Sequence, residues 1–220
     1  MAMRCSRLIN TGGPSHRNHF PVSAGTPVTT VVSSSSTGTS TPTPRKTLGR
    51  RVCDWIEAYA TIPDGPDIGK PFRIPSFWRQ VIYEWYELVD DGKGGTRRRY
   101  SQGLIGIAKK QIKTSIAAAM ALYELIGSED PAALVISVAS TEDQGSNLLF
   151  GSARTMALHE PLKGVTNVML SEIIVPDQPR ARMRNVTSKA GSQDGVNASA
   201  IFADEVQEWV GQKGRAQFDV

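Results

Sequence analysis

Short apolar runs alternate with longer helical patterns from Leu104 onward, and this alternation constrains the fold more than any other feature of the sequence. Each apolar run has the length of one buried strand, and the segments between them start and end as helices do. The expected strands are 104–107, 132–138 and 198–203, with short strands within 165–187, and the expected helices are 113–126 and 141–158. This order predicts an α/β domain, a three-layer sandwich with a mainly parallel sheet.

Two helices are expected ahead of this region. Apolar residues recur at helical spacing from Leu48 to Tyr59. A second apolar stripe runs from Phe77 to Val89, after Pro75 and Ser76, which are typical of a helix start.

Residues 1–47 have no usable periodicity, and 26–46 consist almost entirely of Ser, Thr, Pro and Gly with a few Val. Such a segment buries too little apolar area to offset its chain entropy, so we expect a disordered tail ahead of a body at 48–220. Residues 1–51 hold seven of the 25 Lys and Arg residues and none of the 21 Asp and Glu residues, which leaves the rest of the chain at −3. The basic charge therefore does not indicate a nucleic-acid-binding surface on the body. The tail is either a basic arm that contacts DNA or a partner, or a solvated extension.

Several classes of protein are excluded by composition. No stretch approaches the ~18 uncharged apolar residues of a membrane span. Cys5 and Cys53 are too few for a disulfide scaffold and are expected to be free thiols in a cytosolic setting. His16, His19 and His159 have no partners at metal-ligand spacing, so no zinc site is predicted.

The segment 106–114 lies between an expected strand and an Ala-rich helix, where phosphate-binding loops occur. Lys113 would reach the β- and γ-phosphates of a nucleotide, and the Thr114 hydroxyl would bind Mg²⁺. The pattern G-x-x-x-x-G-K-[ST] nevertheless fails, because Ile107 and Ile112 occupy its two Gly positions. From this segment alone, the favoured interpretation is an exposed lysine-rich turn.

The strand expected at 198–203 ends in Asp204 and Glu205, as in a Walker B motif. Asp204 would hold Mg²⁺ through water, and Glu205 would orient and deprotonate the attacking water. Acids that suit a helix N-terminus are the alternative interpretation. Both motifs follow strands of one sheet, and ligands bind at the carboxyl ends of such strands, so together they predict a single site.

With these residues identified, the run 72–209 resembles the N-terminal ATPase region of tailed-phage terminase large subunits, the motors that package DNA into proheads. Lys109-Lys-Gln-Ile-Lys-Thr114 is similar to the family's R-K-N-G-K-[ST] phosphate loop. The other similar stretches are 71–88 ahead of the loop, 138–144 after its helix, and 194–209 around the Walker B acids.

The resemblance implies ATP and Mg²⁺ as cofactors and a role for each matching residue. Lys113 and Glu205 would be catalytic, with Lys109 at the position of an arginine that contacts the γ-phosphate. Gln80 would match a glutamine on the adenine side. Ala108, Lys110, Gln111, Ile112, Lys113 and Thr114 would surround the phosphates, and Thr114 and Asp204 would hold the metal.

The resemblance further implies ATP hydrolysis that drives double-stranded DNA into proheads, with the portal protein and the small terminase subunit as partners. It implies a ring homo-oligomer for the full-length protein, in the cytoplasm of a bacterial host that carries a phage or prophage. The chain ends fifteen residues after Glu205, so we expect an incomplete ATPase domain without the family's nuclease domain. Ile112 in place of glycine is expected to weaken phosphate binding.

Two alternatives to the terminase stay open at this point. The first is another P-loop ATPase or helicase, and the second is a non-catalytic prophage remnant that keeps only an interaction surface. Arg97–Arg99 are interpreted either as contacts to DNA phosphates or to the neighbourhood of the nucleotide, or as a solvated strand face.

Overall fold

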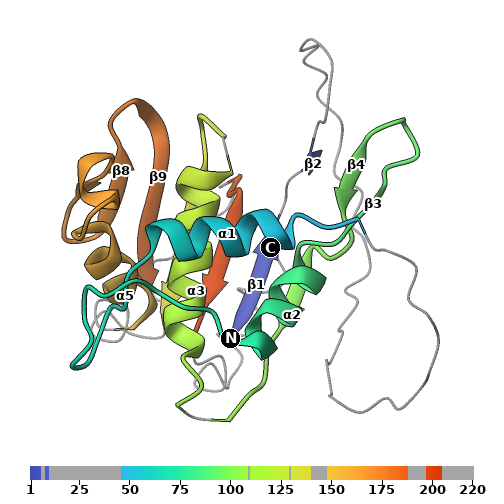
Figure 1. The fold of residues 1–220 in the computed structure, drawn as a ribbon. Coiled ribbons are helices and arrows are strands. Elements are labelled where there is room, and N and C mark those ends of the chain that lie inside the picture. The colour runs from blue at the N-terminus through green and yellow to red at the C-terminus, as the bar shows by residue number, and fades with distance from the viewer. Residues whose placement is uncertain are drawn as a thin grey trace.

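A seven-stranded sheet organises the chain, with strand order β5-β1-β10-β6-β9-β8-β7 (Figure 1). The computed structural model describes residues 1–5, 8–9, 46–108, 110–128, 130–139, 148–187 and 197–204. The strands of this sheet are β1 (Ala2–Cys5), β5 (Gln102–Leu104), β6 (Leu134–Ala139), β7 (Asn167–Val168), β8 (Glu172–Val175), β9 (Gln178–Thr187) and β10 (Ala200–Ala203).

The sheet is mixed, but most of its strands run in one direction. β10 pairs in parallel with β6, and β6 pairs in parallel with β9. β1 and β8 are antiparallel to both of their neighbours. β5 and β7 therefore run in the same direction as β10, β6 and β9. The prediction of a mainly parallel α/β sheet is therefore confirmed, with two strands reversed.

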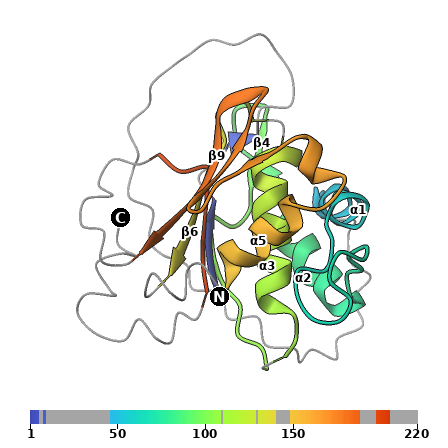
Figure 2. The same ribbon diagram turned by 90° about the vertical axis from the view of Figure 1, so that its left-hand side faces the viewer.

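The described helices lie together on one face of the sheet (Figure 2). They are α1 (Gly49–Tyr59), α2 (Ser76–Trp85), α3 (Lys113–Leu122) and α5 (Leu149–Ala157), with a π-helical turn η1 (Tyr123–Gly127) and a 3₁₀ turn η2 (Leu162–Gly164). The alanines of α3 are fully buried, because small side chains let this helix lie close to its neighbours. Among the described residues no helix covers the other face, so the expected third layer is not found in this part of the chain. None of these helices is long and apolar enough to span a membrane.

The helix expected at 75–89 is shorter than its apolar pattern indicates. It ends at Trp85, and Leu88–Asp90 form strand β3, which pairs with β4 (Thr96–Arg98). β2 (Leu8–Ile9) completes a small sheet of order β2-β4-β3. The inclusion of Phe77 in the buried stripe was also wrong, since Phe77 is exposed and Trp78 is buried.

The expectation of disorder is wrong for two short segments of the tail. Leu8–Ile9 form β2, and Ala2–Cys5 form β1, which lies between β5 and β10 with Met3 opposite Gly103 and Phe202. Met1 and Met3 are each 3% exposed, so this strand contributes to the hydrophobic core. Residues 6–7 and 10–45 of the expected tail lie outside the described residues, and the boundary at 47/48 stays a prediction.

The strand expected at 104–107 is also displaced. β5 ends at Leu104, which is 47% exposed, and the residues after it form the loop that leads to α3. β5 is an exposed edge strand, and such a strand needs no continuous apolar run. The apolar run 104–107 was therefore a poor guide to its position.

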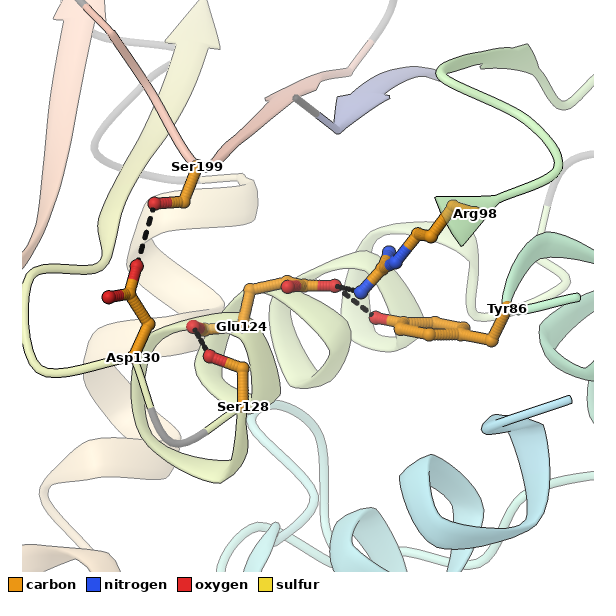
Figure 3. Close-up of polar contacts among 6 residues, drawn as sticks. All are labelled: Tyr86, Arg98, Glu124, Ser128, Asp130 and Ser199. Atoms are coloured by element: carbon orange, nitrogen blue, oxygen red, sulfur yellow. Dashed lines mark hydrogen bonds and ion pairs between the residues drawn. The ribbon is translucent and has the colours of Figure 1, made fainter. Parts of the chain in front are cut away.

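A buried charged network ties the small sheet to the helical layer (Figure 3). Arg98 of β4 contacts the Glu124 carboxylate of η1 at 2.7 Å, and the Tyr86 hydroxyl donates to the same oxygen at 2.7 Å. The Arg98 guanidinium also lies 4.2 Å from the centre of the Tyr86 ring. Arg98 is therefore a buried, paired residue of the interior. For Arg98, the expectations of a DNA contact and of a solvated strand face are both wrong.

Candidate nucleotide site

The loop between β5 and α3 contains two residues with left-handed backbone conformations. Lys110 has a φ of 64°, and Ile112, which precedes the first residue of α3, has a φ of 49° and a ψ of 25°. For a residue other than glycine this conformation costs about 1–2 kcal/mol, and a β-branched side chain makes it rarer still. The position thus has the torsions for which glycine is suited, and the Ile112 side chain is 40% exposed rather than packed in the core.

The end of β10 meets the start of α3. The Thr114 hydroxyl donates to Oδ2 of Asp204 at 2.5 Å, and Nζ of Lys113 lies 3.1 Å from Oδ1 of Asp204. The structure therefore brings together three of the residues that the two motifs singled out. β1 separates β5 from β10 in the sheet, so these contacts cross the end of β1.

The burial of this cluster differs between its members. The Asp204 side chain is 5% exposed and the Lys113 side chain 24%. A buried carboxylate needs compensating donors, and here Lys113 and Thr114 supply them. The arrangement keeps the carboxylate inside the fold, while the Lys113 side chain is partly exposed.

The chemistry of this donor set fits a nucleotide with its metal. A hydroxyl and a carboxylate oxygen side by side are the ligands that Mg²⁺ prefers. Lys113 at the first turn of α3 adds a cation to a helix N-terminus, where anions are stabilised. Because Lys113 already contacts Asp204, an incoming phosphate would have to share or displace that contact.

The other sequence-predicted residues are less closely associated with the cluster. Ala108, Lys110 and Gln111 are exposed on the loop. Gln80 is exposed on α2, two residues after Trp78, and two helical residues are turned by about 200° relative to each other. Since Trp78 faces the loop, Gln80 faces away from it. Lys109 and Glu205 lie outside the described residues.

Two features of the site were not expected from the sequence. The Trp78 indole Nε1–H donates to the Gln111 carbonyl at 2.8 Å, so α2 contacts the loop directly. The backbone of Met1 accepts a hydrogen bond from the Ile105 amide at 2.8 Å, which joins β1 to the start of the loop. No sequence pattern marks either contact, because both depend on tertiary packing.

Comparison with known proteins identifies the family. The family model of the terminase large subunit ATPase domain matches residues 82–217, more than half of the chain. The chain belongs to this family. The terminase prediction is thereby confirmed, and the alternative of an unrelated P-loop ATPase or helicase is wrong.

Individual terminases are similar over part of the chain. The large terminase subunit of Enterobacteria phage HK97 is 27% identical over 123 residues, which are 56% of this chain and 23% of that protein. The crystal structure of the HK97 bacteriophage large terminase matches with a TM-score of 0.51 and 22% identity, and the match covers 70% of this chain and 30% of that one. This structural likeness supports the fold. The chain spans about a quarter of the length of the HK97 subunit.

Proposed function

We propose that this terminase-family chain binds ATP with Mg²⁺ between the first turn of α3 and the end of β10, and hydrolyses it. The observation that carries the proposal is the contact of both Lys113 and Thr114 with Asp204. A lysine, a hydroxyl and a carboxylate at a helix N-terminus are the groups that phosphoryl transfer to water requires around the β- and γ-phosphates.

Each residue has a distinct part in the proposed reaction. Lys113 neutralises phosphate charge, and the backbone amides of Ala108–Ile112 surround the phosphates. Thr114 and Asp204 hold Mg²⁺, which when bound withdraws charge from the phosphate oxygens. Glu205 takes the proton of the attacking water, and Lys109 contacts the γ-phosphate. A lysine there supplies charge without the two-pronged geometry of arginine.

The wider role follows from the family. We infer that hydrolysis serves the packaging of double-stranded DNA into proheads in the cytoplasm of a bacterial host. The partners would be the portal protein, the small terminase subunit and further copies of the large subunit in a ring. The proposed ATPase unit comprises 48–220 together with strand β1, which lies within the same sheet. Gln80 is not assigned to the adenine side, because it faces away from the loop.

A second candidate function is a remnant that no longer hydrolyses ATP. Two observations favour it: the left-handed backbone at Ile112, and the contact between Lys113 and Asp204, which a phosphate must loosen. In this case the chain would keep the fold and its surfaces without turnover.

Titration of the 220-residue chain with MgADP and MgATP, together with phosphate release, tests both candidates. Lys113→Ala should abolish binding, because it removes the cation at the helix start. Lys163→Ala, which removes an exposed lysine on η2, should leave binding unchanged. Binding without phosphate release would favour the remnant, and binding that survives Lys113→Ala would overturn the proposed site.

A further inference from the structure

Trp78 connects the helical layer to the backbone of the phosphate loop. Its side chain is only 1% exposed, and its indole Nε1–H donates to the carbonyl of Gln111 at 2.8 Å. Gln111 is exposed and immediately precedes Ile112, the residue with a left-handed backbone. A buried side chain thus holds the carbonyl of an exposed residue of the loop.

This hydrogen bond fixes the orientation of a single peptide group. In a trans peptide the C=O and N–H point in opposite directions, so a carbonyl directed at Trp78 turns the Ile112 N–H away from it. The same peptide plane limits the φ that Ile112 can adopt. One neutral hydrogen bond has a free energy of the same order as the cost of a left-handed conformation at a non-glycine residue, so Trp78 can offset that cost.

Trp78 can hold the loop because its own helix is fixed. Arg79 contacts the Glu57 carboxylate of α1 at 2.5 Å, and the other oxygen of Glu57 accepts the Ile74 amide at 2.9 Å. These contacts attach the start of α2 to α1. The indole is therefore held in place independently of the loop it contacts.

We propose that Trp78 is a positioning residue for nucleotide binding: its indole N–H holds the Gln111–Ile112 peptide so that Ile112 keeps its left-handed conformation and its N–H is available to a phosphate. The proposal rests on the proposed function of the site. Burial alone requires only that the indole N–H bonds to an acceptor of any kind. The proposal gives a functional reason for the acceptor being the Gln111 carbonyl.

The first test compares Trp78→Phe with Trp85→Phe in the 220-residue chain. Phenylalanine keeps an aromatic ring in the core and removes the donor. Trp85 lies on the same helix, is 6% exposed, and packs against Gly103 of β5 rather than against the loop. Trp78→Phe should raise the MgADP dissociation constant about ten-fold, and Trp85→Phe should change it less than two-fold.

A double-mutant cycle separates positioning from packing. Glycine adopts the left-handed conformation without strain, so the loop of Ile112→Gly depends less on Trp78. Trp78→Phe should therefore weaken MgADP binding at most three-fold when combined with Ile112→Gly. An equal loss in both backgrounds would show that Trp78 acts only through the core.

Hydrogen exchange gives a readout that needs no nucleotide. The Ile116 amide donates to the Ile112 carbonyl at 3.0 Å, and this bond requires the present conformation of Ile112. Exchange at Ile116 should accelerate about ten-fold in Trp78→Phe and stay unchanged in Trp85→Phe. Unchanged exchange in Trp78→Phe would overturn the positioning role.

The two proposals fail in different ways. If neither the unmodified chain nor any variant binds MgADP, the proposed function is wrong, and the Ile116 exchange still decides whether Trp78 holds the loop. If Lys113→Ala abolishes binding while Trp78→Phe behaves as Trp85→Phe does, the function stands and the role of Trp78 is wrong.

Discussion

The hydroxyl of Thr114 donates to the carboxylate of Asp204 at 2.5 Å, although 90 residues separate the two in the chain. The contact exists because α3 starts, and β10 ends, at the same edge of the sheet. It makes Asp204 a shared acceptor for Thr114 and Lys113. Any change at Asp204 must therefore alter the metal ligands and the free charge of Lys113 together.

Asp204→Asn should remove the Mg²⁺ dependence of nucleotide binding. The amide keeps the size of the side chain but loses the charge that attracts the metal, so MgADP affinity should fall about ten-fold or more. Binding of metal-free ADP should not fall, because Lys113 no longer has an anionic partner. Calorimetric titration with and without Mg²⁺ measures both, and Asp177→Asn, in an exposed turn, is the matched control. Equal losses with and without Mg²⁺ would argue against Asp204 as a metal residue.

Ile112→Gly should tighten MgADP binding roughly ten-fold, since the loop no longer carries the cost of a left-handed β-branched residue. Ile112→Ala is the informative control. Alanine removes the β-branch but still resists a φ of 49°, so it should recover only a small part of the gain. The measurement is the MgADP dissociation constant of the unmodified chain, Ile112→Gly and Ile112→Ala. An unchanged dissociation constant in Ile112→Gly would contradict the prediction.

The sequence predicted the parts of this site that depend on local pattern. The Ala-rich helix after Lys113, the apolar strands at 132–138 and 198–203, and the acid that follows the last of them all have the expected type and order. Lys113 and Thr114 meet Asp204 at one edge because β5 and β10 run in the same direction, each antiparallel to β1 between them.

The features that the sequence did not predict depend on distant partners. β1 has only four residues, too few for a strand period to be recognised, and its neighbours β5 and β10 are far along the chain. The Trp78 contact was hidden for a similar reason. A tryptophan on an apolar helix face indicates a core position, and only the packed fold shows that its N–H faces a loop.

Met3→Ala should destabilise the chain by about 2–5 kcal/mol, the usual cost of removing a large apolar side chain from a core. Met3 is 3% exposed and lies between Gly103 and Phe202. Arg4→Ala is the control, since Arg4 is the next residue on the same strand and only partly buried. Urea unfolding curves of the two variants should differ clearly in midpoint. Equal midpoints would show that β1 does not contribute to stability.

Arg98→Met should cost about 3–5 kcal/mol, because it leaves the Glu124 carboxylate buried without its cation. Replacing both residues, Arg98→Met with Glu124→Met, should cost less than Arg98→Met alone, since no unpaired charge remains. Lys70→Met removes an exposed ion pair with Asp67 and should change stability by less than about 1 kcal/mol. Urea unfolding measures all three. A double variant less stable than the single one would contradict this account of the network.

Alkaline pH should destabilise the chain through Cys53. This thiol is fully buried in α1, and burial raises its pKa from 9.0 to about 11, although the nearby Arg79 guanidinium acts in the opposite direction. Because the pKa is higher in the folded chain, the unfolded chain releases the proton first. The contribution to stability is therefore complete below pH 9 and is lost as the pH rises from 9 toward 11.

Two pKa units correspond to about 3 kcal/mol, so the free energy of unfolding should fall by up to that amount across this interval. Burial also raises the pKa of Tyr86 above its usual 10, and its contribution declines over an overlapping range. Cys53→Ala separates the two, because it removes only the thiol. The difference between the unfolding free energies of the unmodified chain and Cys53→Ala should be constant up to pH 9 and then shrink. A difference that stays constant to pH 11 would show that the thiol titrates equally in the folded and unfolded chains.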